Sequence, residues 1–104
     1  MKQEWMEEEL QKVLFPFLGF DYERRPHDLW RVYHWKRLVF RCRILRDQKG
    51  KRKGWMITEN PTLPESDDDG PCTVDMGSIH RYQENFATFL RGRIQEFVEN
   101  LPKI

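Results

Sequence analysis

The strongest constraint on the fold is an alternation of apolar and polar side chains along residues 30–46. Successive side chains of a β-strand point to opposite faces, so this two-residue period predicts extended chain with two different faces. A single strand of that length would far exceed the usual length of about five or six residues, and we therefore expect a turn near Lys36-Arg37. Residues 29–35 and 38–46 are predicted to form the two strands of an antiparallel hairpin.

A third strand is predicted after the hairpin, over residues 54–59. The polar run before it contains Gly50, which can adopt the positive φ that a tight turn needs. One face of the resulting sheet is apolar and must be covered, and it carries Trp30, Val32, Leu38, Phe40, Cys42, Ile44, Trp55 and Ile57. The opposite face mixes arginines with aromatic rings, and it carries Arg31, Tyr33, Trp35, Arg41 and Arg43.

Two amphipathic helices are predicted at the ends of the chain. Residues 3–15 place apolar side chains on one stripe at helical spacing until Pro16 ends the helix. Residues 78–100 do the same over a longer span, with Ser78 as the N-cap. Both helices can cover the apolar face, so we expect a two-layer α+β fold with the order α-β-β-β-α, and one domain over residues 1–104.

The remaining segments are predicted to be connections. Residues 17–20 are too apolar for a solvated loop and are expected to tuck under the sheet, while residues 21–28 lead into the first strand. Residues 60–77 hold three prolines, three consecutive aspartates and two glycines. A long loop is therefore expected there, with one short extended piece at Thr73-Val74.

Charge is distributed unevenly along the chain, although its net value is only +1. Residues 24–54 sum to +10, whereas residues 1–23 sum to −4 and residues 55–104 to −5. The basic segment can present a surface to a polyanion, or the acidic ends can neutralise it within the fold. The charge pattern alone leaves both readings open.

The favoured hypothesis is a small non-enzymatic protein-binding module, acting as an inhibitor, an adaptor or a self-associating subunit such as a homodimer. Aromatic rings and guanidinium groups are typical interface anchors, and the residues assigned to this site on the uncovered face are Tyr33, Trp35, Arg41 and Arg43. The alternative is a nucleic-acid-binding module that uses the basic β-hairpin over residues 41–53, because cations displace counterions from phosphates. The residues of this alternative site are Arg41, Arg43, Lys49, Lys51, Arg52 and Lys53.

No pattern of catalytic or cofactor-binding residues is found, so we expect no enzyme activity, no cofactor and no metal. The histidines and cysteines lack the spacing of a zinc site. Residues 65–76 begin like a calcium loop, but Met76 stands where the bidentate glutamate is needed. Cys42 is expected in the core, where burial suppresses the thiolate, which leaves Cys72 with His80 as the better placed pair for nucleophilic chemistry.

The N-terminal residues are acidic and lack the apolar run of a secretory signal, and no stretch of about eighteen consecutive apolar residues occurs. We therefore expect a cytoplasmic protein that does not enter a membrane. The small size, the high charge and the lack of an enzyme motif also suit a protein of a phage or other mobile element.

Overall fold

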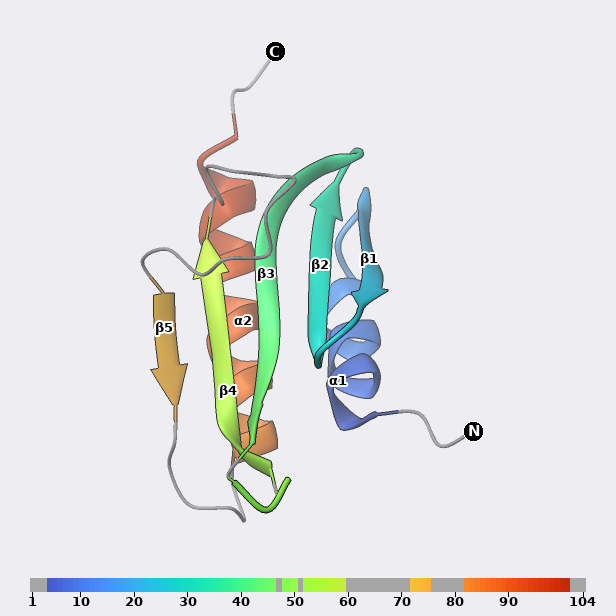
Figure 1. The fold of residues 1–104 in the computed structure, drawn as a ribbon. Coiled ribbons are helices and arrows are strands. Elements are labelled where there is room, and N and C mark those ends of the chain that lie inside the picture. Colours follow the sequence, from blue (N-terminus) through green and yellow to red (C-terminus); the bar gives the residue numbers. More distant parts are fainter. Residues whose placement is uncertain (1–3, 47, 51, 60–71, 76–81, 102–104) are drawn as a thin grey trace.

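The computed structural model describes residues 4–46, 48–50, 52–59, 72–75 and 82–101, which form an α+β fold of two layers (Figure 1). Within these ranges five strands make one antiparallel sheet, and their order in space follows the chain, β1-β2-β3-β4-β5. Two helices contact each other and lie behind the sheet in Figure 1. The elements are α1 (Trp5–Leu14), β1 (Phe20–Arg25), β2 (Leu29–His34), β3 (Arg37–Arg46), β4 (Arg52–Glu59), β5 (Cys72–Asp75) and α2 (Tyr82–Glu99).

Both helices form where the apolar stripes predict them. The buried side chains of α1 are Trp5, Met6, Leu10, Val13 and Leu14. Those of α2 are Phe86, Ala87, Leu90 and Ile94. Residues 1–3 and 78–81, which the sequence also assigned to the helices, lie outside the described residues. In the described ranges neither helix is long and apolar enough to cross a lipid bilayer.

Phe86 stands at the centre of the core, between two tryptophans. Its ring meets Trp5 of α1 edge to face at 5.5 Å between centroids and Trp55 of β4 at 5.6 Å. Such aromatic pairs stabilise a core by about 0.5–1.5 kcal/mol each beyond the area that they bury. One side chain of α2 therefore joins both helices to the sheet.

The prediction of three strands is wrong, because the sheet has two more in the described residues. Residues 20–25, expected to be mostly a connector, form the edge strand β1, in which Phe20 and Tyr22 pack against the core. Four charged residues of this strand hide its alternation, and edge strands tolerate such charge because it discourages pairing with other chains. At the other edge, β5 contains the short extended piece expected at Thr73-Val74, whereas residues 60–71 and 76–77 of the predicted loop lie outside the described residues.

A bulge changes which side chains of the hairpin share a face. The pairing register between β2 and β3 shifts between Val32 and Tyr33, so Phe40 lies opposite Val32 but Leu38 lies opposite Tyr33. Leu38 therefore lies on the same face as Tyr33, the face of the sheet that the helices do not cover, which we call the helix-free face. Its predicted place on the apolar face is wrong. Val39, the additional residue, is buried in the core in its place.

The helix-free face is less open than the sequence suggests. Arg41 and Thr58 are each only 3% exposed there. Leu29 is fully buried in a cross-strand row between Arg25 and Arg43, whose aliphatic stems can cover an apolar neighbour. Much of this face is therefore not a surface that a partner can reach directly.

Arg46, the last residue of β3, joins three other segments of the chain. Its guanidinium donates to both carboxylate oxygens of Asp28, at 2.7 and 3.1 Å, and to the carbonyl of Gly50 at 3.2 Å. It also lies 3.6 Å from the carboxylate of Glu4, just before α1. This arginine lowers the pKa of Asp28 below its ordinary value, mainly through the side-chain hydrogen bond.

Candidate functional site

Trp35 occupies a two-residue turn and not the strand position expected from the sequence. β2 ends at His34 and β3 begins at Arg37, and the two residues between them have positive φ, 48° for Trp35 and 70° for Lys36. Two-residue hairpin turns of this kind favour Asn-Gly, because bulky side chains are strained at positive φ. A tryptophan is thus held in a costly backbone conformation while its side chain remains 64% exposed.

Gly19 holds this turn from the connector between α1 and β1. The backbone N–H of Trp35 donates to the Gly19 carbonyl at 2.9 Å. Gly19 has a φ of +89°, and a Cβ atom built on it would stand 2.4 Å from the indole Cε2. Only glycine fits under the ring, so the indole has a defined position although most of it faces solvent.

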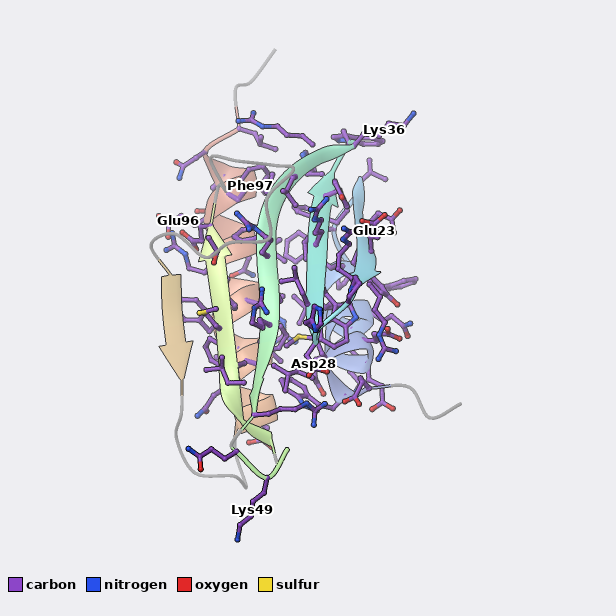
Figure 2. The ribbon with its side chains drawn as sticks, viewed as in Figure 1. Glu23, Asp28, Lys36, Lys49, Glu96 and Phe97 are labelled. Atoms are coloured by element: carbon purple, nitrogen blue, oxygen red, sulfur yellow. The ribbon has the colours of Figure 1, made fainter. Side chains whose placement is uncertain are left out.

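Two further large apolar side chains are exposed on the connector that holds this turn. Phe15 is 91% exposed and Leu18 is 82% exposed, and both belong to the short connector that leads from α1 to Gly19. We call Phe15, Leu18 and Trp35 the apolar patch. Trp35 is the neighbour in sequence of Lys36, which Figure 2 labels at one end of the sheet.

His34 links the apolar patch to the core. Its ring packs 4.6 Å from that of Phe20, 5.3 Å from Phe97 and 5.9 Å from Trp35, measured between centroids. It also bonds to the backbone of Leu18. Desolvation lowers the pKa of His34, and this hydrogen bond opposes the shift in part.

A hollow of about 370 Å³ opens beside the indole. It is lined by Gly19, Asp21, Tyr33, Trp35 and Lys36. The Tyr33 hydroxyl donates to a carboxylate oxygen of Glu23 at 3.4 Å, which fixes the phenol ring near the acidic side chains of β1. The hollow therefore combines two aromatic rings with one exposed carboxylate and one ammonium group.

A second hollow, of about 310 Å³, lies between the end of α2 and the adjoining ends of β3 and β4. Its lining residues include Arg37, Phe40, Arg93 and Phe97. Arg93 donates to both oxygens of Glu59 and, at 2.7 Å, to Glu96, and these contacts raise its pKa. Because this ion-pair network joins α2 to β4, its charges have a structural role.

The four residues predicted for a protein-binding site do not form one surface. Trp35 is exposed at the end of the sheet and Tyr33 is half-buried beside it, where both line the first hollow. Arg41 is buried and lies opposite Arg31 in the sheet. Arg43 is half-buried, opposite Leu29, and donates to the carbonyl of His27 at 3.5 Å. The structure thus brings Tyr33 and Trp35 together and leaves Arg41 and Arg43 elsewhere.

The residues predicted for nucleic-acid binding can be placed only in part. Lys49 is exposed in the turn between β3 and β4. Arg52 and Lys53 lie in β4, where the structure describes only their backbone. Lys51 lies outside the described residues. Nucleic-acid binding by this hairpin stays a prediction.

The structure describes only some of the cysteine and histidine candidates. Cys42 is buried and free, as expected for a core residue, and burial raises the pKa of its thiol far above the ordinary value. Cys72 lies in β5, whereas His80 is outside the described residues. Among the side chains that the structure describes, no group of three or more metal-ligating residues converges.

Sequence reasoning missed Phe15, Leu18 and Asp21. The expectation that residues 17–20 tuck under the sheet is correct for Phe17 and Phe20, which pack against the core, but wrong for Leu18. The available signal was that the apolar run continues past Pro16 without helical or strand spacing.

Comparison with known proteins gives no relative. No protein-family model, no curated protein and no solved structure matches this chain.

Proposed function

We propose that this chain is a small protein-binding module that contacts its partner through the apolar patch. The observation that carries the proposal is that three large apolar side chains are strongly exposed on one connector and on the turn that Gly19 of this connector holds, namely Phe15, Leu18 and Trp35. Exposed apolar residues scattered singly are common, but contiguous apolar surface on a small domain is typical of interaction sites.

Trp35 has the properties of an interface anchor. Tryptophan is among the residues whose truncation costs most at protein interfaces. Gly19 and the backbone hydrogen bond already hold the indole in place, so little conformational entropy remains to be lost when a partner binds. The positive φ of Trp35 supports the same proposal, since strained backbone is often retained where the side chain serves a function.

The alternative nucleic-acid function receives less support from the described residues. A phosphate must reach a guanidinium to displace its counterions, and Arg41 is almost fully buried. Among the hairpin lysines whose side chains the structure describes, only Lys49 is exposed, and one lysine supplies little of the affinity that a polyanion requires. We therefore place the interaction at the apolar patch instead of the basic hairpin.

The decisive experiment compares the double variant Phe15→Ser/Leu18→Ser with Val98→Ser. All three side chains are exposed, but Val98 lies on α2, outside the patch, and serves as the matched control. Both variants should keep the unfolding free energy of the wild type within about 0.5 kcal/mol, because the replaced side chains are at the surface. Self-association is measured first, by sedimentation velocity over a range of concentrations.

If the protein does not self-associate, proteins retained by the immobilised wild type but lost with the double variant are purified and titrated individually. The double variant should bind the purified partner, or a second copy, at least about tenfold more weakly, and Val98→Ser should bind normally. Equal affinity of wild type and double variant for that partner contradicts the proposal. So does steeply salt-dependent oligonucleotide binding that Phe15→Ser/Leu18→Ser leaves unchanged, if no patch-dependent association is found.

A further inference from the structure

We propose that the hollow beside Trp35 receives the guanidinium group of an arginine carried by the bound partner. This inference rests on the proposed protein-binding function, because it names what the partner places next to the apolar patch. Trp35 belongs both to the patch and to the lining of the hollow, so a partner seated on the patch reaches the hollow directly. The volume of about 370 Å³ falls within the range of ordinary ligand sites.

The two aromatic rings of the lining suit a cation. A guanidinium lying over a tryptophan or tyrosine ring, within about 6 Å of its centroid, is attracted by the negative face of the ring, and arginine is found there more often than lysine. The chain already contains one such contact, in which the Arg24 guanidinium lies 5.5 Å from the centroid of the Trp30 ring. Tyr33 and Trp35 offer the same chemistry at the surface.

Asp21 supplies the negative charge that a guanidinium needs. It pairs directly with Tyr33 across the two strands, and its Oδ1 accepts the backbone N–H of Tyr22 at 2.8 Å, which orients the carboxylate. Asp21 is exposed and makes no ion pair with any other described residue. A planar guanidinium can stack on a ring and donate to a carboxylate at the same time, whereas an ammonium group lacks the plane.

The positive charge of Lys36 repels a guanidinium, so the proposal can be tested with two substitutions that should change arginine binding in opposite directions. Lys36 lines the hollow and lies at the upper tip of the molecule in Figure 2, beyond the ends of β2 and β3. Its ammonium is carried on a flexible stem that can turn into water, so it weakens the site without filling it. Removing the charge of Asp21 should therefore weaken arginine binding, and removing the charge of Lys36 should strengthen it.

The test is a titration of the full-length protein with N-acetylarginine amide, followed through the Trp35 indole N–H in ¹⁵N NMR spectra. N-acetylcitrulline amide is the matched control ligand, because it has nearly the same shape without the charge. We expect a saturable shift with arginine in the millimolar range and about tenfold weaker binding of citrulline. The indole resonance is assigned by its absence from the spectrum of Trp35→Phe.

Three variants complete the experiment. Asp21→Asn should weaken arginine binding by about two- to fivefold, and Lys36→Gln should tighten it by about twofold. Glu84→Gln removes an exposed carboxylate at the start of α2, at the opposite end of the molecule, and should change nothing (Figure 1). Equal shifts with arginine and citrulline, or unchanged binding in Asp21→Asn, would overturn the inference.

The failure of this inference and the failure of the proposed function are distinguishable. The arginine titration uses no partner, so its outcome does not depend on whether Phe15→Ser/Leu18→Ser loses association. If arginine does not bind while the patch variant loses its partner, only the arginine proposal is overturned. If arginine binds while association ignores the patch, the hollow is supported as a guanidinium site and the patch function fails.

Discussion

Trp35 lies so close to Gly19 that a methyl group at position 19 would stand 2.4 Å from the indole Cε2 atom. Gly19→Ala is therefore expected to lift the indole away from the connector, and its positive φ adds backbone strain. We expect a loss of about 1–3 kcal/mol in the unfolding free energy, measured by urea denaturation, together with a change in tryptophan fluorescence.

The matched control is Gly92→Ala, in the interior of α2. A Cβ atom at Gly92 has nothing within 4 Å, and alanine favours a helix over glycine by about 0.5–1 kcal/mol. This variant should be slightly more stable than the wild type. A Gly19→Ala protein with wild-type stability and fluorescence would show that Gly19 does not position the indole.

The ion pair between Asp28 and Arg46 predicts that the unfolding free energy falls in acid. Because the folded-state pKa of Asp28 is lowered, its contribution is fully present above the unfolded pKa of about 3.8 and is lost as the pH falls through the folded value. Asp28→Asn should reduce the unfolding free energy at pH 7 by about 0.5–1 kcal/mol, a range kept small because both side chains are partly exposed. The variant and the wild type should converge as the pH falls through the lowered pKa of Asp28.

Asparagine is the appropriate replacement because Asp28 has a φ of 58°, which asparagine also tolerates. Asp21→Asn is the control, since that carboxylate makes no ion pair with the other described residues. Urea denaturation between pH 2 and pH 7 measures both. If the unfolding free energy of Asp28→Asn differed from that of the wild type by the same amount at every pH, the ionisation of Asp28 would not contribute to stability.

Arg93 should couple α2 to the sheet through Glu59. In a double-mutant cycle of Arg93→Ala and Glu59→Ala, we expect a coupling free energy of about 0.5–1 kcal/mol, because both side chains are about one-third exposed. The parallel cycle of Arg91→Ala with Glu59→Ala should give no coupling, since Arg91 is an exposed residue of the same helix that makes no ion pair with Glu59. Equal coupling in the two cycles would mean that the contact with Arg93 contributes nothing specific.

His34 should titrate below its ordinary pKa of 6.5, because burial among aromatic rings disfavours the imidazolium. The neutral form is therefore favoured by folding, so the stabilisation is complete above pH 6.5 and declines as the pH falls through the lower folded value. NMR titration of the imidazole protons measures the midpoint directly. A midpoint above 6.5 would contradict the packing described around His34.

The two-layer fold was predictable because its signals are local and periodic. The alternation along residues 30–46 gives the central hairpin, and the apolar stripes of α1 and α2 give the covering layer. β1 was not predicted because four of its six residues are charged, as is common in edge strands. These charges hide the alternation of apolar and polar side chains. Leu38 was assigned to the wrong face because a bulge inserts one residue, and no composition signal marks where it occurs.

The candidate site was less predictable, because exposure depends on where separate elements end. Trp35 was predicted on the face of the sheet, but the turn lies one residue earlier than predicted and places this side chain at the tip. Arg41 was predicted on an exposed surface because it is charged, but the structure buries it. Phe15 and Leu18 look like core from sequence alone, and only the path from α1 to β1 leaves them outside.

The order of the strands has a consequence for how the chain acquires its core during synthesis. Every strand pairs with its neighbour in sequence, so the sheet can assemble hairpin by hairpin from nearby residues as they emerge. Phe86, which joins both helices to the sheet, is made only after β1 to β4. We therefore expect a nascent chain that ends before α2 to hold a nearly complete sheet whose apolar face lacks the cover of α2, a stage at which exposed apolar surface favours aggregation.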